Sequence, residues 1–105
     1  MVTPVTPVAG LISQVQTGGV AVTFNAGDPN GGFITNPASN VDQGVYPAAA
    51  ENLYVDPTGN AATLEANGTT FALAPGQTWN LIPGQTTATT VNAATSGHKF
   101  SGIVE

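Results

Sequence analysis

The chain of 105 residues has no cysteine, so neither a disulfide nor a thiolate metal site can stabilise its fold. With a single histidine, His98, any metal site would depend on carboxylate and carbonyl oxygens. Basic residues are nearly absent too, because Lys99 is the only lysine and arginine does not occur. Nucleic acids and anionic membrane surfaces are bound through several basic residues, so we exclude both as direct partners.

Long apolar runs are also missing. No stretch approaches the roughly 20 apolar residues of a membrane-spanning helix. The first residues do not combine a basic region with an apolar run, so we expect no secretory signal in the sequence as written.

Charge of either sign is scarce. Charged residues make up only 7% of the chain, against about 25% in typical soluble domains, and the formal net charge is −5. The surface must therefore be covered mainly by Thr, Asn, Gln and Ser. Neutral polar groups cost less to remove from water than charges do, which suits this chain to lying against other proteins. The alternative is a threonine-rich β protein that simply remains soluble.

Uninterrupted helical windows are few, because 13 glycines and 8 prolines are spread along the chain. We expect no helix beyond a single turn near residues 48–51. Short apolar runs bounded by turn residues predict strands instead, and residues 38–50 are expected to form a surface loop. The fold class is therefore all-β, a single small antiparallel β-sandwich or flattened barrel of about seven to eight short strands. The expected strands lie at residues 19–24, 33–35 and 53–55, at two places within residues 69–82 on either side of Pro75-Gly76, and at residues 89–93 and 99–104.

Alternation of apolar residues is clearest on either side of Pro75-Gly76, where residues 71 and 73 share one face, as do residues 79 and 81. Proline followed by glycine favours a type I or II turn, whose twist does not suit a two-residue hairpin. We therefore expect either a longer connection or a crossing between two sheets at this corner. The predicted core comprises Phe24, Phe33, Leu53, Val55, Phe71, Leu73, Trp79, Leu81, Val91 and Phe100.

Patterns typical of catalytic or metal sites are missing or incomplete. Residues 28–32 resemble the start of a calcium loop, but the later ligands are missing, so we expect an ordinary turn. Ser96 is too near His98 along the chain to be its nucleophile, and no Gly-x-Ser-x-Gly motif occurs. Nothing pairs the acids as a glycosidase would require. We expect no enzyme activity, no metal and no cofactor. The six acids are Asp28, Asp42, Glu51, Asp56, Glu65 and Glu105.

Two surface features allow alternative interpretations. Residues 67–69 form a glycosylation sequon, but they also favour a turn that opens a strand, which is the interpretation we adopt. Tyr46, Tyr54 and Trp79 could together stack against a sugar. Trp79 alternates with Leu81, however, so we expect it in the core rather than in such a platform.

The first ten residues are expected to form an extended arm, followed by a β-sandwich domain at residues 11–105. Proline recurs at every third position of this arm, which disfavours a β-ladder and favours polyproline II. Because polyproline II has three residues per turn, the valines lie along one edge that could dock onto a neighbouring protein. A frayed terminus is the alternative. The candidate assembly interface consists of Val2, Pro4, Val5, Pro7 and Val8.

Four segments within residues 31–105 resemble small proteins encoded among the virion genes of tailed bacteriophages and prophages. They are residues 31–37 (GGFITNP), 51–56 (ENLYVD), 67–79 (NGTTFALAPGQTW) and 91–100 (VNAATSGHKF). The resemblance implies a non-enzymatic capsid decoration protein, made in the host cytoplasm and located on the outer surface of the virion. Its implied partners are the major capsid protein or another virion protein, together with further copies of itself as a homo-oligomer.

Two other functions compete with capsid decoration. One is a spike, fibre or surface module that binds carbohydrate or a receptor, which exposed aromatic residues would favour. The other is a secreted bacterial β-module, which would require a signal sequence. Copy number separates decoration, with many copies over the particle, from a spike or fibre, with a few copies at one vertex.

Overall fold

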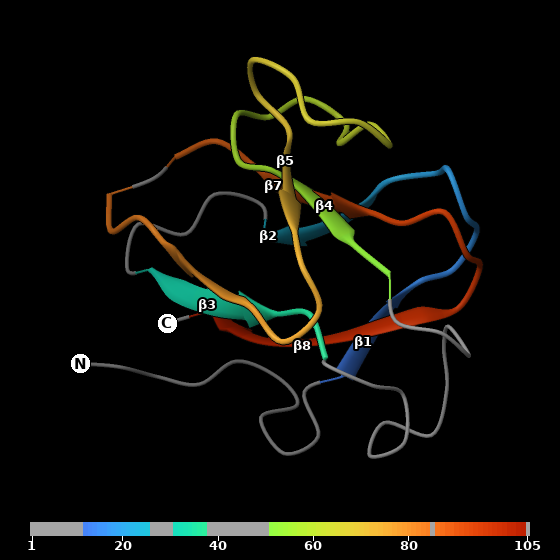
Figure 1. Ribbon diagram of the computed structural model, residues 1–105. Coiled ribbons are helices and arrows are strands. Elements are labelled where there is room, and N and C mark those ends of the chain that lie inside the picture. Colours follow the sequence, from blue (N-terminus) through green and yellow to red (C-terminus); the bar gives the residue numbers. More distant parts are fainter. Residues whose placement is uncertain (1–11, 26–30, 38–50, 85, 105) are drawn as a thin grey trace.

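The computed structural model describes residues 12–25, 31–37, 51–84 and 86–104, and these residues contain eight β-strands and no helix (Figure 1). The strands form two four-stranded sheets in which neighbouring strands are antiparallel. The predicted all-β sandwich is therefore confirmed. The strands are β1 (Ile12–Val15), β2 (Val22–Asn25), β3 (Gly32–Thr35), β4 (Leu53–Asp56), β5 (Phe71–Leu73), β6 (Thr78–Leu81), β7 (Thr89–Asn92) and β8 (His98–Val104).

The strand order is that of one long antiparallel hairpin rolled up on itself. β1 pairs with β8, β2 with β7, β3 with β6 and β4 with β5. Rolling the hairpin then places β8 beside β3 and β7 beside β4. Sheet A has the order β1-β8-β3-β6 and sheet B the order β2-β7-β4-β5, which is the topology of an eight-stranded jelly roll (Figure 1).

The Pro75-Gly76 corner carries the chain from sheet B to sheet A, because β5 and β6 on its two sides belong to different sheets. This is one of the two predicted alternatives. Gly76 has φ +86°, a left-handed conformation that glycine adopts without strain. Its amide donates to the carbonyl oxygen of Asn36 at 2.6 Å, so the corner is tied to the end of β3.

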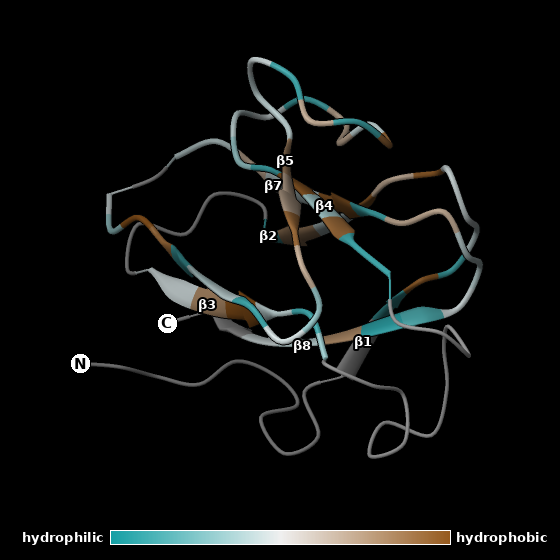
Figure 2. Cartoon of the chain, in the orientation of Figure 1, coloured by the Kyte–Doolittle hydropathy of each residue, from teal (hydrophilic) through white to brown (hydrophobic). Residues whose placement is uncertain are grey.

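The hydrophobic core lies between the two sheets, whose strands carry most of the apolar residues (Figure 2). The predicted aromatic residues Phe24, Phe71 and Trp79 are half-buried and pack against this core. The prediction for Phe33 is wrong: Ile34 is the fully buried residue of β3, and alternation places Phe33 on the outer face of sheet A. The predicted residues that are buried are Leu53, Val55, Leu73, Leu81, Val91 and Phe100.

The two sheets approach each other closely at Gly102 of β8. A Cβ atom there would lie 2.5 Å from Cζ of Phe24, which reaches across from β2. The ring of Phe24 also packs edge-on against that of Phe100, with centroids 5.8 Å apart. Glycine is favoured at this position because a Cβ atom would meet the Phe24 ring and would also lie 2.7 Å from the backbone oxygen of Phe33, which cannot rotate away.

The N-terminal strands differ from the sequence prediction. β1 was not predicted, because its sequence ISQV has apolar residues only at its ends. β2 begins at Val22 rather than at residue 19, since the amide of Val20 donates to the carbonyl of Thr17 and closes a turn. Predictions for residues 1–10 and 38–50, including most of the single helical turn, lie outside the described residues.

Candidate functional site

His98 is the centre of a polar cluster whose members lie up to 62 residues apart in the sequence. It opens β8 and is 1% exposed. Its Nε2 lies 2.9 Å from Oδ1 of Asn36, at the end of β3, and its Nδ1 lies 3.3 Å from Oε1 of Glu51, just before β4. We call these three residues the His98 cluster.

Asn36 determines which ring nitrogen of His98 carries hydrogen. The Nδ2 group of Asn36 donates to the carbonyl oxygens of Glu51 at 2.9 Å and Leu73 at 2.8 Å. Its Oδ1 atom must therefore be the acceptor that faces the ring, so Nε2 of His98 donates. In the neutral ring, Nδ1 then carries no hydrogen, so it can donate to the carboxylate of Glu51 only when the ring is protonated.

Burial lowers the pKa of His98 below its ordinary value of 6.5, because the charged ring is poorly solvated there. The hydrogen bond and negative charge of Glu51 act in the opposite direction but are weaker. The Glu51 side chain is 25% exposed, so water screens part of its attraction. The imidazole therefore remains neutral to a lower pH than a free histidine would.

The His98 cluster braces the fold and has no nucleophile to activate. The hydroxyl of Ser96, the nearest candidate in sequence, accepts a hydrogen bond from the amide of Gly18 at 2.8 Å. Both ring nitrogens of His98 face Asn36 and Glu51 instead. A Ser/His arrangement for acyl transfer is therefore not formed by these residues.

A second polar cluster surrounds Asp56, which ends β4 and is fully buried. Its Oδ1 accepts hydrogen bonds from the amide and the hydroxyl of Thr58, at 2.9 and 2.6 Å. Its Oδ2 accepts from the hydroxyls of Thr69 and Thr70, at 2.7 and 3.0 Å. We call these four residues the Asp56 cluster. It holds both ends of the connection between β4 and β5 against sheet B.

Burial alone would raise the pKa of Asp56, because a carboxylate is poorly solvated inside the protein. The hydrogen bonds from Thr58, Thr69 and Thr70 outweigh burial and lower the pKa below its ordinary value of 3.8. Asp56 is thus a permanently ionised anchor at neutral pH rather than a proton donor.

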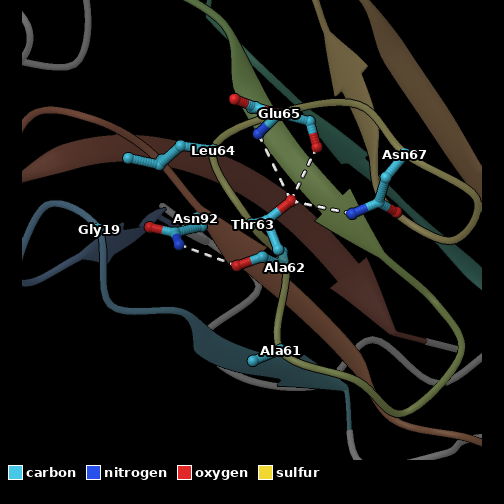
Figure 3. A pocket seen from close by; sticks show the side chains of 8 residues that line it. All are labelled: Gly19, Ala61, Ala62, Thr63, Leu64, Glu65, Asn67 and Asn92. Carbon is cyan, nitrogen blue, oxygen red and sulfur yellow. Dashed lines mark hydrogen bonds between the residues drawn. The ribbon is translucent and has the colours of Figure 1, made fainter.

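The connection at residues 57–70 folds back over the outer face of sheet B, where β7 fixes its middle. The hydroxyl of Thr90 accepts from the amide of Ala62 and donates to the carbonyl of Asn60, both at 2.8 Å. Nδ2 of Asn92 donates to the carbonyl of Ala62 at 2.9 Å (Figure 3). Residues of β7 that face outward are therefore buried under this connection.

A shallow hollow of about 570 Å³ lies where this connection meets the β1–β2 turn (Figure 3). Leu64 is its exposed apolar residue, 39% accessible to solvent. Most of its polar side chains are already used within the protein: Nδ2 of Asn67 donates to the hydroxyl of Thr63, which itself donates to the carbonyl of Glu65. The lining residues are Gly19, Ala61, Ala62, Thr63, Leu64, Glu65, Asn67 and Asn92.

The turn predicted at residues 67–69 is present. Oδ1 of Asn67 accepts hydrogen bonds from the amides of Thr69 and Thr70, at 2.8 and 2.7 Å. Both ends of the Asn67 amide are thus engaged in shaping the turn that leads into β5, which accounts for the sequon without glycosylation.

The aromatic residues do not form the stacking platform within the described part of the chain. Trp79 packs against Phe71 of the other sheet, with ring centroids 5.2 Å apart, while Tyr54 lies on β4 and is half-buried. Tyr46 lies outside the described residues, as do Asp28 and the whole candidate assembly interface of Val2, Pro4, Val5, Pro7 and Val8.

Sequence reasoning missed the roles of Asn36, Glu51 and Asp56, although the turn signal after Asp56 was available to it. Across the described ranges, no three His, Asp or Glu side chains gather as metal ligands, and no helix in these ranges is long and apolar enough to span a bilayer. Comparison with family models, with curated proteins and with solved structures finds no match to this chain.

Proposed function

We propose that this chain is a non-enzymatic structural protein that decorates a virion, binding in many copies to the outer surface of a capsid. Its partner would be the major capsid protein or another virion protein. Jelly rolls recur in viral capsid proteins, which supports the proposal as an analogy of fold. The sequence resemblance to phage virion proteins points the same way.

The observation that carries the proposal is the lack of charge on the described surface. Of the four described residues that carry a formal charge, Asp56 is buried, Glu51 and Lys99 are partly buried, and Glu65 alone is exposed. A surface of Thr, Asn and Gln loses little hydration energy when another protein covers it. Such a surface suits a module that lies on a protein lattice, where many weak contacts add up.

The number of copies per particle tests this proposal. We expect quantitative mass spectrometry of purified particles to find this protein in a number comparable to that of the major capsid protein. A few copies, located at one vertex by electron microscopy, would contradict decoration and support a spike or fibre role.

Deleting residues 1–8 tests the candidate arm. We expect the truncated protein to keep its β-sheet circular dichroism spectrum but to bind particles at least about tenfold more weakly, because burial of three valines is lost. Val2→Ser, Val5→Ser and Val8→Ser combined in the full-length chain form the matched control for apolar contact. Full occupancy by the truncated protein would exclude a docking role for the arm.

A module that binds carbohydrate or a receptor is the second candidate, and the hollow at Leu64 favours it. The hollow has a volume within the usual range of small-ligand sites, and lectins also use jelly rolls. Saturable binding on a glycan array, abolished by Leu64→Asp and kept by Asn60→Asp outside the hollow, would favour this function over decoration.

A further inference from the structure

The outer side of β6 is a free sheet edge among the described residues, because β3 is the only strand beside it. The ladder shows which backbone groups face outward. The amide of Asn36 donates to the carbonyl of Gln77 at 3.0 Å, which puts these two residues in phase with the hydrogen-bonded pairs of the ladder, although the amide of Gln77 donates to Ala74 instead of returning the bond. Such pairs alternate along an antiparallel ladder. Trp79 therefore bonds to Ile34, its partner in register, while Thr78 and Asn80 turn their N–H and C=O groups away from β3.

The contact between Thr35 and Thr78 supports this assignment independently. These two residues are partners in register, and their hydroxyl oxygens are 2.6 Å apart. Pairs that do not exchange backbone hydrogen bonds bring their side chains closest together. Thr78 is thus in a non-bonded pair with β3, and its backbone groups point to the free edge.

This edge lacks most of the usual protection against strand pairing. Natural edges are commonly protected by a short strand length, charged side chains, bulges or proline, and of these β6 has only its short length. β6 contains no charged residue, bulge or proline, and no Asp, Glu, Lys or Arg occurs anywhere from residue 66 to residue 98. Next to the strand, Ile82 is 60% exposed, the largest exposed fraction among the large apolar side chains described.

We infer that β6 is a self-association edge, at which two copies of this chain pair their β6 strands antiparallel about a two-fold axis. Placing Thr78 opposite Asn80 of the second copy gives each outward N–H group a carbonyl acceptor. The result is one continuous eight-stranded sheet built from two copies of sheet A.

The distribution of charged residues favours a second copy of this chain as the partner that pairs with β6. Each copy carries a formal net charge of −5, so two copies repel wherever their acidic residues approach. Among the described residues, β6 and its partner strand β3 carry no charge, so two copies can meet at this edge without that repulsion. Residues 1–8 would be a poorer occupant, because Pro4 and Pro7 would fall on alternate sides of a strand and one of them would always lack a needed N–H.

The pairing is weak because β6 is short. Four residues a side bury less than the about 1,200 Å² at the lower end of stable interfaces, so we expect a dissociation constant on the order of micromolar to millimolar. This inference goes beyond the proposed function, since it requires no capsid and is measured on the purified chain alone.

Sedimentation equilibrium of the full-length chain, from about 1 µM to about 1 mM, tests the pairing together with hydrogen exchange. We expect a monomer–dimer equilibrium in which exchange of the Thr78 and Asn80 amides slows as the dimer forms. The amides of Trp79 and Leu81 should be protected at every concentration, because they bond to β3. A monomer throughout the range, or slowed exchange at another strand instead, would overturn the inference.

Two substitutions of Asn80 sharpen the test. Asn80→Pro removes an outward N–H without breaking the β3 ladder, and Asn80→Lys places like charges together on the paired edge. We expect each to weaken dimerisation about tenfold or more. Asn60→Lys, the same change at an exposed site in the connection between β4 and β5, should leave it unaffected. If Asn80→Pro proves misfolded, Asn80→Lys decides alone; a dimer that persists in it refutes the pairing.

Discussion

The His98 and Asp56 clusters are both buried and polar, but they differ in how far apart along the chain their members lie. The Asp56 carboxylate binds threonines 2, 13 and 14 residues away, all in the connection that follows its own strand. The His98 ring lies against Glu51 and Asn36, which are 47 and 62 residues away. One cluster therefore shapes a single connection, while the other joins distant parts of the jelly roll.

This difference also decides which cluster links the two sheets. Asn36 follows β3 of sheet A, and its amide reaches the carbonyl of Leu73 on β5 of sheet B. The Asp56 cluster instead attaches a surface connection to one sheet. Loss of the first should thus affect global stability more than loss of the second, because unpaired groups would be left between the sheets.

Asn36→Ala should be the more damaging substitution. It leaves the carbonyls of Glu51 and Leu73 and Nε2 of His98 without their partner, and each unpaired buried group costs about 1–3 kcal/mol. We expect a loss of about 3–5 kcal/mol in the free energy of unfolding, measured by urea denaturation with Trp79 fluorescence. Asn60→Ala, which removes one exposed hydrogen bond, is the control; an equal loss there would contradict the bracing role of Asn36.

Asp56→Ala should destabilise the protein less, by about 2–3 kcal/mol. Two of its partners are hydroxyls of Thr69 and Thr70, which can rotate toward other acceptors once the carboxylate is gone. Asp56→Asn keeps the shape and one acceptor oxygen, so we expect it to cost about half as much. The same urea titration measures both variants, and an equal loss in the two would show that charge, not hydrogen-bond number, dominates.

The local cluster was partly predictable from sequence and the long-range cluster was not. Aspartate followed by Pro57, Thr58 and Gly59 predicts a turn, and the Thr58 amide indeed donates to the Asp56 side chain. Nothing near His98 in the sequence indicates Asn36 or Glu51 as its partners. Their contact depends on sheet pairing between segments far apart in the chain, which no local pattern specifies.

The same division applies to the fold. Alternation around Pro75-Gly76 predicted two strands and a crossing between sheets as one option, because turn chemistry is local. Phe33 and Ile34 are adjacent and both apolar, so the sequence of this four-residue strand does not show which of the two faces the core. The partners β8 and β6, with Ile34 opposite Gly102 and Trp79, determine the phase. The interface residues of the N-terminal arm stay a prediction, as they lie outside the described part of the chain.

The smallest expected effect is the change of stability with pH. It distinguishes the two clusters, because each should lose stability in a different pH range. The folded-state pKa of His98 is lowered, so between that value and 6.5 the unfolded chain binds more protons than the folded one. Stability should thus decrease as the pH falls below about 6.5. The lowered pKa of Asp56 makes its contribution complete above 3.8 and causes its loss only as the pH falls through the folded-state value.

We therefore expect two separate losses of stability on acidification, the first from His98 and the second including Asp56. Among the described residues, Glu51 is the one charged group that faces the imidazole, and its attraction reduces the first loss without reversing it. Urea titrations between pH 7 and pH 3 at constant ionic strength measure both steps. His98→Gln cannot take up a proton, so it should be less stable at pH 7 yet lack the first step, while Asp56→Asn should keep the first step and show a smaller second one. If His98→Gln still loses stability in the first step, that step must come from another group. His98 would then not differ from Asp56 in the pH range over which it affects stability.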